Sequence, residues 1–200
     1  MVPEAQRPAG RDEKYLTIAY EATEQCVDDR TFRSIMGTLP TGVTVVTTLD
    51  ADGQPLGMTC SAVCSVSMRP PMLLVCINRD SRVLDAILRR DAFLVNVLRD
   101  SREDVSTLFA SPRPDRFEVA RWRPSPVTGL PWIHRDTIAH AECRVASAIT
   151  AGDHVVVMGV ILGGDCETTA TPLMYWRRRY APWPAQHDDA AAAIMLAAEG

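Results

Sequence analysis

Residues 57–71 of this 200-residue chain combine small hydroxyl and thiol side chains in a pattern that suits ligand binding. The segment reads GMTCSAVCSVSMRPP and ends on two prolines. Serine, threonine and cysteine side chains gain little from burial, but they and their backbone N–H groups can donate hydrogen bonds to a ligand. We therefore predict that this segment, built from two strand-like pieces, lines a binding site. The alternative is a hairpin whose small residues allow close packing of strands.

Residue types that several common enzyme chemistries require are missing. Lys14 is the only lysine and lies in a polar N-terminal stretch, so the domain offers no Schiff-base or Walker-type lysine. The chain also lacks GxGxxG and GxSxG motifs, which disfavours a dinucleotide-binding sheet and an α/β-hydrolase. The six cysteines and four histidines do not show metal-ligand spacing, so we expect no metal site.

Charge and hydropathy narrow the possible partners. The formal net charge of −4 argues against nucleic acid, because phosphate binding usually requires a basic excess. No apolar run approaches the ~20 residues that span a bilayer, and residues 1–14 lack the apolar region of a secretory signal. We therefore expect a cytoplasmic protein without a membrane partner, whose cysteines serve as small core residues.

The apolar pattern predicts a mainly β domain with short helices. Strands and helices do not alternate regularly, so a parallel sheet is disfavoured and a small antiparallel barrel of about six strands fits best. Ser101 and Asp104 resemble a capping box at the start of one helix. The strands are expected at 43–48, 56–61, 72–77, 93–98, 139–149 and 154–162, and the helices at 32–39, from 81 and from 101.

The expected domain organisation is simple. Residues 1–27 form an N-terminal extension, in which 15–20 could dock as a short strand. Residues 28–184 form the barrel domain, and residues 185–200 form an alanine-rich tail, possibly helical. The proline-rich stretch 110–135 is expected to be a long irregular loop, and such a loop inside a compact domain usually has a functional role.

Five groups of residues, in this order and at compatible spacings, give the chain a family resemblance over about residues 29–183. The sequence resembles the short-chain flavin reductases, the reductase components of two-component flavin-dependent monooxygenases. It departs from the usual pattern at Val63, Arg69, Cys60 and Cys64. The groups are Phe32-Arg33 with 41–48 (TGVTVVTT), 57–59 with 65–67 and Pro70-Pro71, Phe93 with 96–98, Arg116-Phe117, and Gly152-Asp153-His154.

The resemblance implies a six-stranded antiparallel split β-barrel of the Greek-key, FMN-binding type, and a homodimer with flavin bound near the interface. It also implies hydride transfer from NADH or NADPH to FMN or FAD, and delivery of the reduced flavin to a separate monooxygenase. Because hydride passes directly between the two cofactors, no catalytic side chain is expected. The sequence does not distinguish FMN from FAD, since both carry the same ring and first phosphate.

The resemblance and the residue types together suggest two sets of binding residues. Ser81 is expected to open a helix whose free N–H groups, with Arg82, suit a flavin phosphate; an ordinary N-cap serine is the alternative. The flavin set is Thr41, Val43, Thr59, Cys60, Ser61, Ala62, Ser65, Asn78, Ser81, Arg82, Asn96 and Phe117. The nicotinamide set is His154, Arg116 and Tyr180.

Two other functions fit a split barrel. A non-catalytic flavin- or haem-binding carrier or sensor would not need the Gly152-Asp153-His154 element. An oxidase of the pyridoxamine-phosphate type would need more basic residues around its substrate phosphate than this lysine-poor domain offers. The predicted binding roles of single residues also have alternatives. His154 could be purely structural, and Arg116 and Phe117 could simply anchor the loop.

Overall fold

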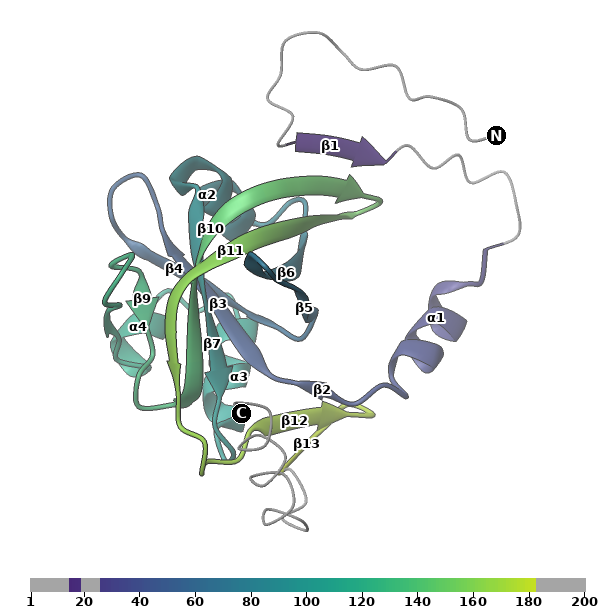
Figure 1. Cartoon of the computed structure of the whole chain (residues 1–200). Helices are drawn as coiled ribbons and strands as arrows, with labels where there is room; N and C mark the ends of the chain where they lie inside the picture. The colour runs from purple at the N-terminus through teal and green to yellow at the C-terminus, as the bar shows by residue number, and fades with distance from the viewer. Residues whose placement is uncertain (1–14, 19–25, 183–200) are drawn as a thin grey trace, which may run out of the picture.

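One antiparallel sheet forms the centre of the protein, as the computed structural model describes it for residues 15–18 and 26–182 (Figure 1). Its strands lie in the order β4-β3-β7-β10-β11-β6-β5, and each neighbouring pair along this path is antiparallel. The strands are β3 (Thr44–Leu49), β4 (Pro55–Cys60), β5 (Val63–Met68), β6 (Pro71–Asn78), β7 (Ala92–Leu98), β10 (Thr137–Ala151) and β11 (His154–Cys166).

The six strands from β4 to β6 curl into a barrel that closes at one corner only. Just beyond the end of β4, the C=O of Ala62 accepts a hydrogen bond of 3.0 Å from the N–H of Cys76 in β6. The Cys60 thiol lies 3.6 Å from the C=O of Cys76 at the same corner. β5 then extends the sheet past β6. The predicted mainly β, six-stranded antiparallel split barrel is confirmed.

Local sequence explains the two long hairpins. β3 is rich in β-branched residues, which favour extended backbone. The turn after it is held by the Asp50 carboxylate, which accepts from the N–H of Asp52 at 3.0 Å and of Gln54 at 2.8 Å. Gly53 there has φ +77° and Gly152, between β10 and β11, has φ +62°. Both values lie in the left-handed region that glycine adopts without strain.

The barrel interior is filled by apolar side chains, and at Gly159 they leave no space for a side chain larger than hydrogen. A Cβ added at Gly159 would lie 2.7 Å from the Phe93 ring and 2.8 Å from Cys143. Helix α2 (Arg82–Arg90) covers one end of the barrel. The helix residues Val83, Leu84, Ala86 and Ile87 are buried.

Smaller elements complete the molecule. The predicted irregular stretch 110–135 contains a short helix and two short strands. Helix α3 does not begin with the predicted capping box, because Ser101 has φ +64° and the helix has no side-chain cap. The elements are α1 (Asp29–Met36), α3 (Glu103–Ala110), α4 (Arg116–Val119), β2 (Thr41–Gly42), β8 (Arg123–Pro124), β9 (Pro131–Trp132), β12 (Leu173–Trp176) and β13 (Arg179–Pro182).

Polar side chains inside the domain hold the stretch 110–135 against the barrel. The Asn96 amide donates to the C=O of Val45 and to Oγ1 of Thr47, both at 3.1 Å, and its oxygen accepts from the N–H of Ile133 at 3.0 Å. The fully buried Glu142 carboxylate accepts hydrogen bonds from the turn after β8. The stretch is therefore fixed in place by buried acceptors and donors rather than by its own regular structure.

The two ends of the described chain lie on the barrel's surface or away from it. β1 (Tyr15–Ile18) pairs in parallel with the end of β10. This agrees with the short strand that we expected within residues 15–20. The possible helix at 185–200 lies outside the described residues. Among the described residues, no helix is both long and apolar enough to cross a membrane.

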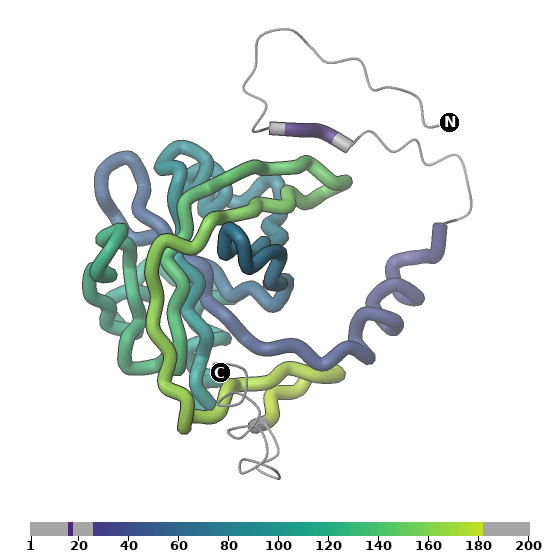
Figure 2. Tube along the Cα trace, viewed as in Figure 1, coloured from purple at the N-terminus to yellow at the C-terminus, as the bar shows by residue number. Residues whose placement is uncertain are grey.

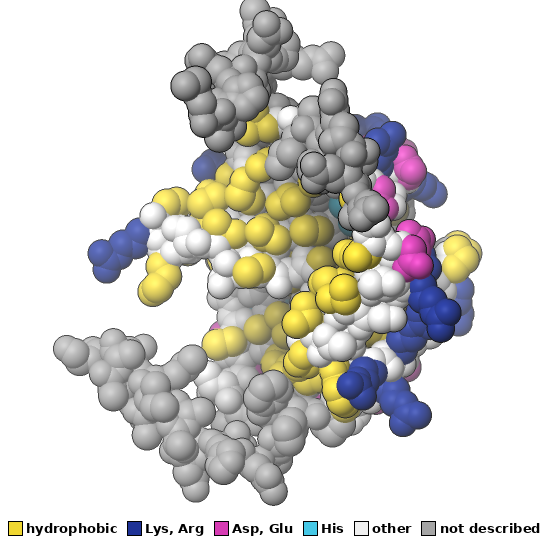
Figure 3. Space-filling model, turned by 90° about the vertical axis from the view of Figure 1, so that its right-hand side faces the viewer, with side chains coloured by type: hydrophobic (Ala, Val, Ile, Leu, Met, Phe, Trp, Pro, Cys, Tyr) yellow, Lys and Arg dark blue, Asp and Glu magenta, His cyan; other side chains and the backbone are white. Residues whose placement is uncertain are grey.

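Helix α1 stands apart from the barrel and buries none of its residues (Figures 1 and 2). Asp28 caps it by accepting from the N–H of Thr31 at 2.7 Å, so the helix begins at Asp29 and ends at Met36, three residues before the expected 32–39 at each end. Its apolar side chains are nonetheless about half exposed, with Phe32 at 57% and Ile35 at 54%. Figure 3 shows hydrophobic side chains gathered over this side of the molecule.

Candidate functional site

The segment 57–65 presents two different faces. Met58 packs against the barrel core and Cys60 is buried in it, whereas Thr59 faces α3 and donates to the C=O of Ser106 at 2.6 Å. Ser61 and Ala62, in the turn between β4 and β5, are exposed, and so is Ser65. Ser61, Ala62 and Ser65 are therefore accessible to a ligand, whereas the Cys60 side chain is not.

Helix α4 closes over the start of this segment. The guanidinium of Arg116 donates to the C=O of Gly57 at 3.0 Å. The Phe117 ring packs edge-on against Phe109, with centroids 5.0 Å apart. A Cβ at Gly57 would lie only 3.0 Å from Phe117 and 3.1 Å from Phe109. The approach of α4 to β4 therefore leaves little room for a side chain at this position.

The turn that opens α2 lies beside the same strand. Ser81 caps the helix by accepting from the N–H of Val83 at 3.2 Å, and its hydroxyl lies 3.7 Å from the sulfur of Met58. The Asn78 side chain accepts from the N–H of Asp80 at 2.9 Å, which shapes the turn. The expected start of the helix at Ser81 is thus confirmed, and the contact with Met58 places this start beside β4.

The positive charges of Arg82 in α2 and Arg116 in α4 are close enough to influence each other. Burial and, secondarily, the positive charge of Arg82 lower the pKa of Arg116. Within residues 26–182 neither arginine forms an ion pair with a carboxylate. Like charges held together without a counter-charge, beside free helix N–H groups, form a favourable place for an anion such as phosphate.

His154 lies next to this turn. It pairs with Asn78 in the register of β11 and β6, and the C=O of Asp153 accepts from the N–H of Arg79 at 3.0 Å. Its Nδ1 lies 2.8 Å from the Asp153 carboxylate, and the hydrogen bond from His154 lowers the pKa of Asp153. The imidazole side chain is 45% exposed, so the carboxylate orients a ring that a ligand can reach.

Tyr180 and Thr41 are linked through the small sheet β13-β12-β2. The Tyr180 hydroxyl lies 3.0 Å from the hydroxyl of Ser106, the same residue whose C=O binds Thr59. Tyr175 pairs with both Tyr180 and Thr41 in the strand register. Ser106 thereby ties the hairpin β12–β13 to β4. The sequence reasoning missed Ser106, because a serine in a short helix carries no distinguishing pattern.

Three predicted flavin residues belong instead to the interior. Asn96 is fully buried and both amide hydrogens and the amide oxygen are bonded within the domain. Val43 is buried, its N–H donates to the C=O of Leu173, and its own C=O accepts from Leu98. Cys60 is buried as well, and burial raises the pKa of its thiol. Their side chains support the site from behind and do not line it.

Most of the remaining predicted residues are linked by contacts between neighbouring elements, whereas the exposed Ser61, Ala62 and Ser65 lie on the β4–β5 turn and on β5. The chain of contacts runs from the small sheet through α3 to β4, then to α4 and the α2 turn, and ends at β11. The exposed hydroxyl and amide groups of these residues, with the guanidinium groups of Arg82 and Arg116, fit a planar ligand that carries a phosphate. Among the described residues, no group of three or more potential ligands lies close enough to hold a metal ion.

Comparison with known proteins gives consistent matches over most of the chain. The sequence pattern of the family described as "Flavin reductase like domain" matches residues 36–184. "Flavin reductase (NADH)" of Kitasatospora aureofaciens is 57% identical over 186 residues, which cover 92% of this chain and 97% of that protein. The reductase subunit HsaB of a flavin-dependent monooxygenase of Mycobacterium tuberculosis is 40% identical over 156 residues, covering 77% of this chain and 82% of that protein.

A solved structure agrees with the fold. The Streptomyces globisporus C-1027 NADH:FAD oxidoreductase SgcE6, in complex with NAD and FAD fragments, is 29% identical and superposes with a TM-score of 0.75. The match covers 82% of this chain and all of that one.

Proposed function

The chain belongs to the flavin reductase-like domain family, and we infer from this membership and from the site that it is an NAD(P)H:flavin oxidoreductase. It transfers hydride from a reduced nicotinamide to FMN or FAD and supplies the reduced flavin to a monooxygenase component. The chemistry of transfer resides in the two heterocycles, so the protein's part is to bind and orient them. The structural observation that best supports this function is the exposed turn at Ser61 and Ala62, together with Arg82 and Arg116, neither of which forms an ion pair within residues 26–182.

We propose that the flavin ring lies along residues 59–65. The exposed Ser61 and Ser65 hydroxyls and the backbone of Ala62 are the available donors and acceptors. Donors fixed at the edge of the ring would stabilise the negative charge that reduction places there. Thr59 is held by α3 and contributes the wall of the site. We leave Val43, Cys60 and Asn96 out of direct contact because they are buried.

The flavin phosphate is proposed to lie at the start of α2. Ser81, Arg82 and the turn at Asn78 bring N–H groups and one guanidinium to this point. Arg116, which the sequence assigned to the nicotinamide, reaches the C=O of Gly57 in β4 and lies close enough to Arg82 for the two charges to interact. We therefore assign Arg116 to the flavin phosphate, while Phe117 packs the loop that carries it.

The reduced nicotinamide is proposed to approach from the side of His154. Asp153 accepts a hydrogen bond from Nδ1 of His154, which leaves Nε2 of the neutral ring free to accept one from the incoming nucleotide. Tyr180 remains at the rim, because its hydroxyl is held by Ser106. These two residues therefore lie on different elements on either side of the proposed flavin.

The activity is tested by mixing the purified protein with NADH or NADPH and excess free flavin. Oxidation is followed at the absorbance band of the reduced nicotinamide. Flavin-dependent oxidation is the expected result, and its absence with both FMN and FAD would contradict the reductase function. In the active protein, His154→Ala should raise KM for the nicotinamide and leave flavin affinity within twofold.

The phosphate assignment has its own test. Ser81→Ala combined with Arg82→Ala removes a cap and a charge-assisted bond, each of which contributes on the order of 1–3 kcal/mol. Affinity for FMN should fall by about tenfold or more. Riboflavin, which has the same ring without a phosphate, is the matched control and should bind as before. Equal losses for both ligands would place the phosphate elsewhere.

We also propose a homodimer, a cytoplasmic location, and residues 28–184 as the reductase domain. The exposed apolar side of α1 supports the dimer, since such faces usually pack against a partner. All six cysteines are free, as a reducing compartment would keep them. Light scattering should give twice the monomer mass of 22.0 kDa. Phe32→Asp with Ile35→Asp should give the monomer, whereas the exposed control Arg30→Asp should not.

A further inference from the structure

A cavity of about 330 Å³ lies where the end of β9, the start of β10 and the end of β11 meet. In the part of the chain that the structure describes, four buried side-chain nitrogen atoms have no hydrogen-bond partner. They are Nε of Arg99, Nδ1 of His134, and Nδ1 and Nε2 of His140. All four belong to residues that line this cavity. Unpartnered buried polar groups are rare because each one costs free energy, so their presence around one cavity indicates a ligand.

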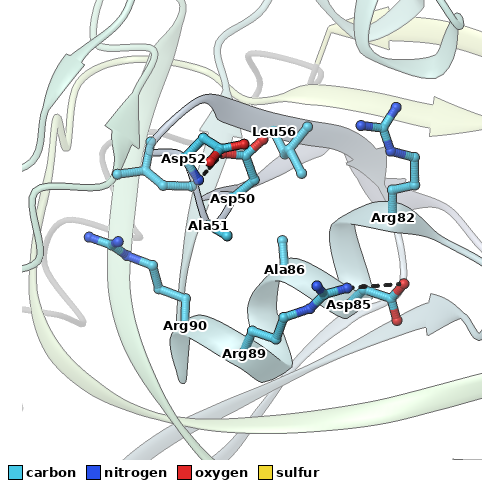
Figure 4. Close-up of a pocket in the computed structure, with 10 residues that line it drawn as sticks. Asp50, Ala51, Asp52, Leu56, Arg82, Asp85, Ala86, Arg89 and Arg90 are labelled. Atoms are coloured by element: carbon cyan, nitrogen blue, oxygen red, sulfur yellow. Dashed lines mark hydrogen bonds and ion pairs between the residues drawn. The ribbon is translucent and has the colours of Figure 1, made fainter.

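The cavity between the β3–β4 turn and α2 is different, although it is larger, at about 430 Å³ (Figure 4). Its lining includes Asp50, Arg82 and Asp85, but none of the four unpartnered nitrogens. One oxygen of Asp50 already accepts from two N–H groups of its own turn. Among the described residues, those of this larger cavity therefore leave no buried side-chain nitrogen or oxygen in need of a partner.

The cavity at His140 is separate from the proposed flavin site. His140 pairs with Asp165 near one end of the β10–β11 hairpin, whereas His154 pairs with Ala151 at the other end. The strand from His140 to Ala151 corresponds to about 35 Å of extended chain. No residue that we assign to the flavin or to the nicotinamide lines the cavity. A ligand bound here would therefore occupy a second site.

Flat rings and apolar side chains form part of the cavity wall. Trp132 stacks on His140, with ring centroids 4.0 Å apart and planes inclined by 27°. The same indole meets His134 edge-on at 5.9 Å. Ile138 and Ala139 add apolar surface to the lining. A wall of this kind suits a planar ring, which gains from burial and from contact with other rings.

The charges around His140 disfavour an anionic ligand. The Glu142 carboxylate lies 3.7 Å from Nε2 of His140, and Asp165 and Glu167 line the cavity. Arg99, the arginine of the lining, already pairs with Glu167 at 2.6 Å. Burial lowers the pKa of His140, so its ring is neutral at pH 7. An anion would therefore meet three carboxylates with no free positive charge to balance them.

The unpartnered nitrogens require both an acceptor and a donor from the ligand. Nε of Arg99 can only donate a hydrogen bond. The carboxylate of Glu142 favours the His140 tautomer that carries its hydrogen on Nε2, which leaves Nδ1 as an acceptor. A cation lacks the acceptor that Arg99 needs, whereas a hydroxyl group can both accept and donate.

We propose that this cavity binds a small neutral phenol, whose hydroxyl meets the unpartnered nitrogens of His140 and Arg99 and whose ring packs on the apolar wall. The imidazole of His140 is only 3% exposed, so the hydroxyl would replace contacts that water cannot freely supply. This second site does not depend on the flavin reductase function given above.

The experiment titrates the protein with phenol and follows the ring ¹⁵N signals of His134 and His140 by NMR. Both should shift, with a Kd on the order of 1 mM for a ligand of this size. His140→Phe keeps a flat ring against Trp132 but removes both nitrogens, and the signals of His134 should then report binding weakened about fivefold or more. His154→Phe is the matched control, a histidine outside the cavity, and should leave the Kd within twofold.

Two further ligands test the chemistry without any change to the protein. Anisole has the same ring but no hydroxyl hydrogen, and benzoate carries a negative charge. Each should bind about fivefold or more weakly than phenol. Saturating FMN should change the Kd of phenol by less than twofold, because the two sites are separate.

Each contrary result overturns the proposal in its own way. Anisole as tight as phenol would mean that only the ring is recognised, and tighter benzoate would mean an anion site. Competition with FMN would place phenol in the flavin site, and unshifted signals of His134 and His140 would mean that the cavity holds only water. The reductase function fails independently, if NADH and NADPH are not oxidised with flavin while phenol still binds.

Discussion

Replacing Glu142 with glutamine tests whether a buried carboxylate holds the loop that carries Arg116. One oxygen of Glu142 accepts from the Ser125 hydroxyl at 2.6 Å and from the N–H and hydroxyl of Thr128 at 2.6 and 2.7 Å. The N–H of Val127 adds a contact of 3.1 Å. Glutamine keeps the size but loses the charge, and its NH₂ group faces donors. Hydrogen bonds to a charged group contribute about 1.5–3 kcal/mol each, and an orphaned buried donor costs a similar amount.

With at least two of these bonds lost or weakened, Glu142→Gln should lower the free energy of unfolding by about 3–5 kcal/mol at pH 7. Urea unfolding followed by fluorescence or circular dichroism measures the change, and the slope of the transition should stay the same. The exposed Glu118 provides the control, since Glu118→Gln should change stability by less than about 0.5 kcal/mol. A loss below about 1 kcal/mol for Glu142→Gln would refute the reasoning.

The same substitution has a pH signature. Burial alone would raise the pKa of Glu142, but the hydrogen bonds from Ser125, Thr128 and Val127 together lower it. A carboxyl with a lowered folded pKa contributes stability that is present above its unfolded pKa of about 4.3 and is lost as the pH falls through the folded value. The unmodified protein should therefore lose this contribution in acid, and the gap to Glu142→Gln should narrow below about pH 4.

Three further outcomes follow from other contacts. Burial lowers the pKa of His140 despite its neighbouring carboxylates, so the protein loses stability as the pH falls below the unfolded value of about 6.5. In His140→Phe the midpoint of urea unfolding should therefore vary less between pH 7 and pH 5 than in the unmodified protein. Gly57→Ala should destabilise the protein by about 1–3 kcal/mol and weaken flavin binding, because its Cβ would press on Phe117; thermal unfolding and a flavin titration measure both. Tyr180→Phe should cost about 1 kcal/mol in urea unfolding through the lost bond to Ser106.

The elements that the sequence predicted well are those specified by local chemistry. The strand expected at 43–48 and the helix start at Ser81 each depend on residues within a few positions. The predicted capping box at Ser101 is wrong because the Ser101 backbone is left-handed, and its N–H donates to the Asp100 carboxylate at 2.7 Å. A capping pattern in the sequence does not reveal such a competing local bond.

The site was only partly predictable, because a family motif identifies a position in the chain but does not show whether the side chain there is buried or accessible to a ligand. Thr59 and Cys60 are adjacent in one motif, yet strand alternation turns one towards α3 and buries the other. Asn96 has the residue type of a ligand contact, but its partners lie 37 to 51 residues away in the chain. A local sequence pattern does not predict hydrogen bonds between residues so far apart in the chain.

The long loop shows how a buried polar group can act on the proposed site from a distance. Glu142 fixes one part of the stretch 110–135, and Arg116 on another part of it reaches the C=O of Gly57. If these parts move as one, Glu142→Gln should weaken FMN binding more than riboflavin binding even at temperatures where the barrel stays folded, because the displaced group would be a phosphate ligand. A uniform loss of both ligands would instead mean that the barrel itself has loosened. The ratio of the two affinities therefore tells whether the carboxylate stabilises the whole fold or specifically positions Arg116.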